Sequence, residues 1–239
     1  MCFHKQELQC KATPDAPDAV YARKLQEVLG GQYGEITVAL QYSFQAWNAH
    51  VPGKYRDLLF GIGAEEFGYV VDSMGNPWQG SYITASGNLL ADFTANANAE
   101  MQGRLQVARL YHMTNDHGVR AMLSFLLARD TMHQNQWMAA ARELQESKME
   151  ELPVPSNFPL KKEAREVSYQ YLNFSDGKAA AEGSWASGPT PDGKGEFSYP
   201  RDPRRGLRCR RRPTRTHVST APPKYPMSWK RLREHCRTN

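Results

Sequence analysis

Four segments of this chain place an acidic residue, or an acid and a histidine, on an apolar stripe with helical spacing. The residues are Glu35, Glu66, Glu100, Asp130 and His133. A bare carboxylate in a protein core is costly, and several carboxylates at one level repel each other. Divalent cations remove both penalties, because glutamates can bridge two metal ions and imidazole nitrogens complete the coordination. The pattern indicates a di-metal carboxylate site inside a helical bundle.

Each of these residues taken alone has a more ordinary explanation. A single glutamate on a helix stripe is more often at the rim of the core, with its carboxylate in water. A single histidine there is more often a hydrogen-bonded core residue. The repetition in four segments is what favours metal binding.

Helical periodicity predicts the elements that must position these residues. The expected helices cover residues 18–29, 33–48, 54 to 72, 88–113 and 118–147. No window shows the alternation of a strand, and beyond residue 150 proline and glycine recur while the helical period is lost. We therefore expect an all-α fold: a four-helix bundle over 1–150, an irregular extension over 151–200 and a tail over 201–239.

The tail differs in charge from the rest of the chain. Residues 201–239 contain 13 Lys and Arg against 2 Asp and Glu, whereas the remainder holds 17 against 23. A basic tail can bind nucleic acid by neutralising phosphates. Trp229 and Tyr225 stand among the basic residues but form no known nucleic-acid recognition motif. We favour a solvated, disordered terminus and do not expect nucleic acid as a partner.

Composition also bears on location. The four cysteines are Cys2, Cys10, Cys209 and Cys236, without the paired spacing of a zinc site or a disulfide framework. No apolar run reaches the roughly 18 residues that a membrane helix needs. The first ten residues lack the apolar core of a signal peptide. We expect a cytoplasmic protein that has no membrane partner.

Long stretches of the chain carry a family resemblance. They are GGQYGEITVALQYSFQAWN (30–48), KYRDLLFGIGAEEFG (54–68), GNPWQGSYITASGNLLADFTANANAEMQGRLQVARLYHMTNDHGVRAMLSFLLARDTMHQNQW (75–137), LPVPSNFPL and NFSDGKAAAEGSWASGPTPDGKGEFSY. This sequence resembles the manganese catalase family. The resemblance implies a ferritin-like bundle, two manganese ions per chain, a homohexamer, and disproportionation of hydrogen peroxide to water and oxygen as a defence against oxidative stress.

The resemblance also implies roles for individual residues. Glu35 would be a terminal ligand, Glu66 and Glu100 would bridge the two ions, and His133 would be a histidine ligand. Tyr42 would place its phenol near the metal ions, and Asp130 would stand beside His133 without binding metal. The family carries a calcium site between bundle and extension, which Asp57, Asn173, Ser175 and Gly177 match, whereas a further aspartate is replaced by Gly61.

The second metal-binding helix departs from the family pattern. That pattern has Glu-x-x-His followed by several helical turns and a long loop, but this chain has Glu66-x-x-Tyr69 and reaches Gly75 almost directly. A long piece of the pattern is absent. Either Tyr69 stands where the second histidine should be, or it belongs to the downstream side of the gap and replaces nothing. Loss of one histidine ligand predicts weakened or absent catalase activity.

Three functions therefore remain open from the sequence. The first is a manganese catalase, impaired by the missing histidine. The second is a non-catalytic structural or assembly (coat-type) member of the same family. The third is a nucleic-acid binder that uses the tail over 201–239. Metal content and oxygen evolution distinguish the first two, and salt-dependent DNA binding that requires the tail would support the third.

Overall fold

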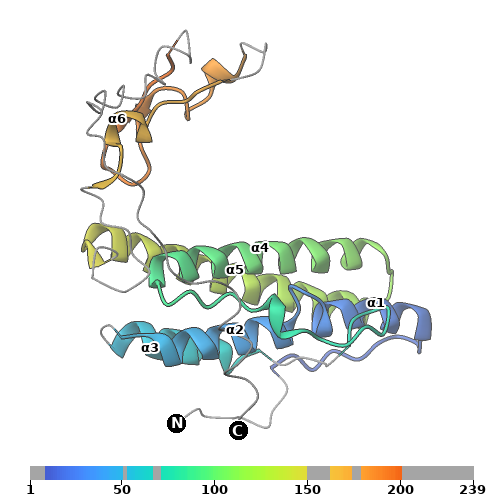
Figure 1. Cartoon of the computed structure of the whole chain (residues 1–239). Helices are drawn as coiled ribbons and strands as arrows, with labels where there is room; N and C mark the ends of the chain where they lie inside the picture. The colour runs from blue at the N-terminus through green and yellow to red at the C-terminus, as the bar shows by residue number, and fades with distance from the viewer. Residues whose placement is uncertain (1–8, 51–52, 67–70, 150–161, 174–178, 201–239) are drawn as a thin grey trace, which may run out of the picture. The chain divides into compact units, whose positions relative to one another are not determined.

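The structure is a computed structural model that describes residues 9–50, 53–66, 71–149, 162–173 and 179–200 of the 239 (Figure 1). By its internal contacts the chain divides into two compact units, one that ends at Glu163 and one that begins at Ala164. The first unit carries every residue predicted to bind manganese.

The first unit is a bundle of helices, as predicted. Its elements are α1 (Ala19–Gly30), α2 (Glu35–Asn48), α3 (Gly53–Gly63), the 3-10 turn η1 (Gly80–Tyr82), α4 (Leu89–His112) and α5 (His117–Glu146). The two long helices α4 and α5 lie side by side along most of their length, and α2 packs with α3 below them in the view of Figure 1. None of the described helices is both long enough and apolar enough to cross a bilayer.

Short polar side chains fix where three of these helices begin. Side-chain oxygens of Asp18, Asn88 and Asp116 each accept a hydrogen bond from the backbone N–H three residues further on, at 2.9, 3.0 and 2.9 Å. Such caps satisfy one of the backbone donors that a helix leaves unpaired at its start. The caps begin α1, α4 and α5 within one residue of the predicted positions.

The predicted third helix is too long, and this expectation is wrong. Helix α3 ends at Gly63 instead of continuing to residue 72, and Ala64 and Glu65 form a turn. Glycine weakens a helix, and Gly63 also allows close packing, because a Cβ there would lie 3.3 Å from the Cβ of Tyr42 in α2. Glu66 therefore lies beyond the helix end and not on a helical stripe.

An apolar core joins α2, α3, α4 and α5. Its largest side chains, Tyr42, Leu59, Phe93 and Trp137, are fully buried. The Trp137 ring packs against the rings of Tyr42 and Phe93, with centroids 4.8 and 5.3 Å apart. A second cluster packs α1 against the far ends of α4 and α5. The core thus fixes α3 against its neighbours and with it the turn that carries Glu66.

Truncation of Leu59 should loosen the anchor of α3. Leu59→Ala removes a side chain with no exposed surface, and large-to-small changes of this kind cost about 2–5 kcal/mol. The free energy of unfolding, measured with urea, should fall by that amount. Met74→Ala is the control, because Met74 is 78% exposed, and should change the value by less than about 0.5 kcal/mol.

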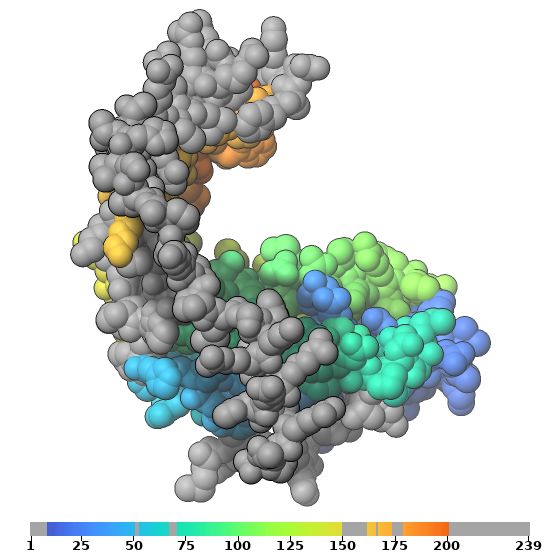
Figure 2. All heavy atoms as spheres, in the orientation of Figure 1, coloured from blue at the N-terminus to red at the C-terminus, as the bar shows by residue number. Residues whose placement is uncertain are grey.

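The segment between α3 and α4 lies on the outside of the first unit, shown teal in Figure 2. The Ser73 hydroxyl donates a 2.7 Å hydrogen bond to Glu27 in α1, and the Trp78 indole N–H donates a 2.9 Å hydrogen bond to Thr37 in α2. These bonds hold residues 71–88 against α1 and α2. They bring the chain back across the bundle to the start of α4.

The second unit contains little regular structure over its described residues, 164–173 and 179–200. It has α6 (Arg165–Ser168), η4 (Ala179–Glu182), β1 (Gly188–Pro189) and β2 (Glu196–Phe197). The two strands pair antiparallel, with Gly188 opposite Phe197. The expectation of an irregular extension needs one addition, namely this two-residue hairpin pairing. It was not predicted because strands of two residues show no alternation.

Candidate metal centre

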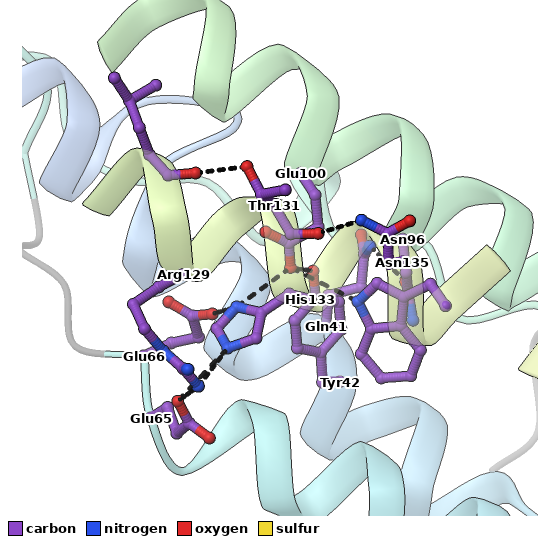
Figure 3. Close-up of polar contacts among 12 residues, drawn as sticks. Gln41, Tyr42, Glu65, Glu66, Asn96, Glu100, Arg129, Thr131, His133 and Asn135 are labelled. Atoms are coloured by element: carbon purple, nitrogen blue, oxygen red, sulfur yellow. Dashed lines mark hydrogen bonds and ion pairs between the residues drawn. The ribbon is translucent and has the colours of Figure 1, made fainter. Parts of the chain in front are cut away.

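One histidine and two glutamates from three parts of the bundle converge in the core. They are Glu66 in the chain after α3, Glu100 in α4 and His133 in α5, and each offers a ligand atom within 4.8 Å of the others. His133 Nδ1 lies 3.0 Å from Oε1 of Glu66 and 3.8 Å from Oε1 of Glu100. The three side chains are at most 7% exposed. Figure 3 shows the imidazole pointing at both carboxylates.

The contact between His133 and Glu66 has an unusual character. Within the described part of the chain, His133 Nδ1 forms no hydrogen bond, although it lies 3.0 Å from a carboxylate oxygen. A buried polar atom without a hydrogen-bond partner is rare and needs an explanation. Both atoms can instead be metal ligands, with their lone pairs directed at the same position. A cation at that position would bind both atoms and so explain why no hydrogen bond joins them. The residues present therefore fit a divalent metal ion.

Glu35 extends this group along α2. It is the first residue of the helix, and its side chain helps to line a small cavity together with Glu66, Glu100 and Asp130. Burial raises the pKa of Glu35 well above its usual range, and the neighbouring charge of Glu66 raises it further. A hydrogen bond also joins the two side chains. Without a cation, Glu35 therefore holds a proton that it shares with Glu66.

The other acids of the cavity also resist ionisation. Burial raises the pKa of Glu66 to about 8 and the pKa of both Glu100 and Asp130 to about 7. Burial is the largest cause in each case because it disfavours the charged form. The charge of Glu100 raises the pKa of Glu66 further, and that of Glu35 raises the pKa of Asp130. A bound cation would reverse this balance by favouring the carboxylates.

Two aromatic residues hold the Glu100 carboxylate. The Tyr42 hydroxyl donates a 2.5 Å hydrogen bond to Oε1 of Glu100, and the indole N–H of Trp137 donates one of 3.4 Å to the same oxygen. Burial, followed by the charge of Glu100, raises the pKa of Tyr42 well above its usual range. Tyr42 is therefore a neutral phenol. Its hydroxyl donates a hydrogen bond that orients the Glu100 carboxylate.

Sequence reasoning missed a buried amide network beside this site. The Gln41 amide donates to Asn96 at 2.9 Å, and Gln45 and Asn96 exchange two hydrogen bonds of 2.8 and 2.7 Å. Gln41 and Gln45 stand four residues apart on the face of Tyr42. That spacing on an apolar stripe was a signal in the sequence. These hydrogen bonds connect α2 to α4 and fix the position of Glu35 in α2 relative to Glu100 in α4.

Two further residues contact His133 and were also missed. Oε2 of Glu65 lies 3.3 Å from His133 Nε2 and forms an ion pair with Arg129. Arg129 precedes His133 by one helical turn, so their shared face was visible in the sequence. The role of Glu65 was not visible, because it depends on the turn that follows α3.

The remaining predicted residues have separate surroundings. Asp57 is exposed on α3 and lies 4.0 Å from the side chain of Arg56. Asn173, in the second unit, donates a 2.8 Å hydrogen bond to the Tyr199 hydroxyl. Ser175, Gly177 and Tyr69 lie outside the described residues. The calcium site and the two interpretations of Tyr69 stay predictions.

A helical bundle that buries glutamates and a histidine from facing elements defines the ferritin-like class of carboxylate metalloproteins. The family model described as "Manganese containing catalase" matches residues 1–71 and again 68–228. The chain belongs to the manganese catalase family. The match extends beyond residue 199, where the resemblance seen in the sequence ends.

Curated relatives and solved structures agree with this assignment. A manganese catalase of Bacillus subtilis is 46% identical over 83% of this chain and 90% of its own length. The protein YjqC of the same organism, described as uncharacterized, is 47% identical over 83% of this chain and 89% of its own length. The crystal structure of KatB, a manganese catalase from Anabaena, superposes with a TM-score of 0.66 at 24% identity, over 84% of this chain and 100% of KatB, which shows the shared fold.

The comparisons also locate the gap in the family pattern. The two matches to the family model meet at residues 68–71, directly after Glu66. The alignment with YjqC has 249 positions, and 83% of 239 residues is about 198, so about 50 positions have no residue in this chain. Tyr69 belongs to both matches, so both interpretations of this residue stay open.

Proposed function

We propose that this protein is a manganese catalase that disproportionates hydrogen peroxide to water and oxygen, with activity reduced by the missing histidine. The carrying observation is the buried approach of His133 Nδ1 to Glu66 without a hydrogen bond. Together with Glu100 and Glu35 it supplies the donor set that the resemblance implies, except for the second histidine. The position of these residues in the bundle and the named manganese catalase relatives support the same reaction.

In this proposal Glu66 and Glu100 would be shared ligands of two manganese ions, His133 would be a ligand of one of them, and Glu35 would be a terminal ligand. Each manganese pair would supply two electrons to one peroxide and recover two from the next, so that two peroxides give two waters and one oxygen molecule. The bridging carboxylates come from the chain after α3 and from α4, which the core holds together. Tyr42 orients Glu100 through its hydrogen bond.

Proton handling is the other task of the chain's own residues. Asp130 lines the cavity beside Glu35, Glu66 and Glu100. In the metal-free chain burial raises the pKa of this carboxyl group to about 7, and a bound cation would favour its ionised form. Peroxide needs a proton acceptor when it is oxidised and a proton donor when it is reduced. With metal bound, Asp130 would be the proton acceptor.

Reduced activity follows from the ligand count. The converging group in the described residues contains one histidine. A second imidazole would bind one ion and help to set its potential. Tyr69 could replace it only as a phenolate, which requires loss of a proton from a group whose ordinary pKa is about 10. A phenolate would also add negative charge and favour the oxidised ion.

The test is the metal content and the oxygen yield of the same protein sample. The full chain is folded with excess manganese, desalted and analysed for manganese per chain, and oxygen evolution from hydrogen peroxide is followed with an electrode. We expect bound manganese and a kcat more than about 100-fold below that of the Bacillus subtilis manganese catalase, because a direct ligand is missing and not only a supporting residue, whose loss costs about 10–100-fold. That relative, prepared in parallel, is the control.

Two outcomes would contradict the proposal. Manganese near zero per chain would show that the chain keeps the fold without the chemistry, in favour of a structural or assembly role. Bound manganese without oxygen evolution would support a non-catalytic member. Two further properties belong to the same proposal: a cytoplasmic homohexamer, and calcium binding, which the family resemblance assigns to Asp57, Asn173, Ser175 and Gly177.

A further inference from the structure

The two ring nitrogens of His133 face two different groups of residues. Its Nδ1 atom faces the carboxylates of Glu66 and Glu100, as described above. Its Nε2 atom faces Oε2 of Glu65 at 3.3 Å and a terminal nitrogen of Arg129 at 3.5 Å (Figure 3). A neutral imidazole carries one proton, and Nδ1 makes no hydrogen bond within the described residues, so the contacts at Nε2 decide which nitrogen has the lone pair.

Glu65 and Arg129 favour opposite tautomers of the ring. An ionised Glu65 can only accept, so its contact requires a proton on Nε2. Arg129 can only donate, so a bond from Arg129 to Nε2 would require the proton to be on Nδ1. The two contacts cannot both be hydrogen bonds of one neutral ring.

The distances decide between the two partners. The Arg129 nitrogen is at the outer limit for a hydrogen bond to Nε2. The same nitrogen forms a much shorter charged hydrogen bond with Glu65. Charge-assisted bonds of this kind are the stronger ones. Arg129 therefore donates its hydrogen bond to Glu65 and not to His133. Glu65 is then the acceptor for the Nε2–H group of His133. The lack of a hydrogen bond at Nδ1 agrees with this assignment.

We propose that Glu65, held by Arg129, positions His133 by fixing the Nε2–H tautomer, which leaves Nδ1 as the nitrogen that binds metal. The inference rests on the proposed function for the identity of the metal only. Glu65 is a positioning residue because it contacts the far side of the ring and not the cluster of ligand atoms. The side chains of Glu65 and Arg129 are 36% and 34% exposed, so both can be replaced without opening the core.

Loss of Glu65 should invert the tautomer. In Glu65→Ala, Arg129 loses its carboxylate partner, and Nε2 of His133, 3.5 Å away, is an acceptor within its reach. A bond from Arg129 to Nε2 moves the ring proton to Nδ1 and blocks the metal-binding nitrogen. In the double variant Glu65→Ala with Arg129→Ala, neither partner acts on Nε2, and the ring is free to populate both tautomers. The double variant should therefore bind metal better than the single one.

Two separate measurements on the full chain test this. The first determines the tautomer of His133 in the metal-free protein, and the second determines the affinity for manganese. Ring nitrogen chemical shifts of His133, from ¹⁵N-labelled protein at a pH where the ring is neutral, report which nitrogen carries the proton. Affinity is measured by titration with manganese(II) and detection of the free ion by electron paramagnetic resonance. Glu146→Ala is the matched control, because Glu146 is an exposed glutamate at the end of α5, away from the site.

We expect Nε2–H in the wild type and Nδ1–H in Glu65→Ala, with a 10–100-fold loss of manganese affinity, and no change in Glu146→Ala. Retention of Nε2–H and of affinity within twofold in Glu65→Ala would overturn the inference. A double variant as impaired as the single one would overturn the part assigned to Arg129. If the wild type binds no manganese but its tautomer still depends on Glu65, the positioning stands and the proposed function falls.

Discussion

Glu100→Gln is expected to remove manganese binding and at the same time to stabilise the metal-free protein. Glutamine has nearly the same shape, and its amide oxygen can still accept the 2.5 Å hydrogen bond from Tyr42. It has no negative charge and cannot bridge two cations. The affinity for manganese should fall more than 100-fold, because a ligand to both ions is lost rather than a supporting residue, whose loss costs about 10–100-fold. Oxygen evolution should fall with it.

The gain in stability has a separate cause. Burial raises the pKa of Glu100 from 4.5 to about 7, so ionising this group above pH 7 opposes folding. Each pKa unit corresponds to about 1.4 kcal/mol, so the replacement should recover on the order of 1–3 kcal/mol at pH 8.5. A change of 1 kcal/mol moves Tm by about 2–4 °C in a protein of this size. The metal-free variant should therefore melt several degrees above the metal-free wild type.

The two effects are separated by melting both proteins with a chelator and with excess manganese. Manganese should raise Tm of the wild type, since it binds the folded state, and should leave Glu100→Gln unchanged. Glu146→Gln, the same substitution at an exposed position of α5, should behave as the wild type in both conditions. A Glu100→Gln protein that binds manganese normally would show that Glu100 is not a metal ligand. A metal-free variant that melts below the metal-free wild type would show that burial of the Glu100 carboxylate does not destabilise the fold.

The sequence predicted the bundle well because its helices are long and have clear start signals. Periodicity placed the starts of α1, α4 and α5 within a residue, and the structure shows that Asp18, Asn88 and Asp116 cap them there. The end of α3 was predicted wrongly because the apolar period continues past Gly63. At the end of the helix Gly63 packs closely against Tyr42, and that contact lies between residues about 20 apart in the chain, where spacing does not reveal it.

For the candidate site, too, the residues within long helices could be predicted from spacing, and those beyond a helix end could not. Helical spacing placed Glu100 and His133 on apolar stripes, and both are buried in α4 and α5 as that pattern predicts. Glu66 was chosen through a helical stripe on which it does not lie. It approaches His133 from the chain beyond α3, so the helical argument for it was wrong. That these residues bind manganese stays a prediction. The second ring contact, from Glu65, required the turn geometry and could not be predicted from spacing.

Metal-free protein should lose stability as the pH rises from about 5 to about 8. The folded state raises the pKa of Glu66 to about 8 and those of Glu100 and Asp130 to about 7. The unfolded chain releases these protons near pH 4–4.5. Between the two values the folded state holds more protons than the unfolded state, so the free energy of unfolding falls with rising pH.

The slope follows from the number of groups involved. Each group that is protonated only in the folded state contributes a loss of about 1.4 kcal/mol per pH unit. Carboxyl groups with lowered pKa, such as Asp15 and Asp116, act in the opposite direction. Their contribution is lost only as the pH falls below about 4, outside this window. The decline between pH 5 and 8 therefore reports on the buried acids.

Manganese should reverse the trend. Protons and cations compete for the same carboxylates, so binding releases protons and strengthens as the pH rises. Urea unfolding at pH 5.5, 6.5, 7.5 and 8.5, with a chelator or with saturating manganese, measures both curves. The metal-free curve should fall and the manganese curve should rise until they are furthest apart at the highest pH, and Glu100→Gln should flatten the first. Metal-free stability that rises over this range would mean that the acids are ionised in the folded chain without a cation, which their burial beside one another makes costly.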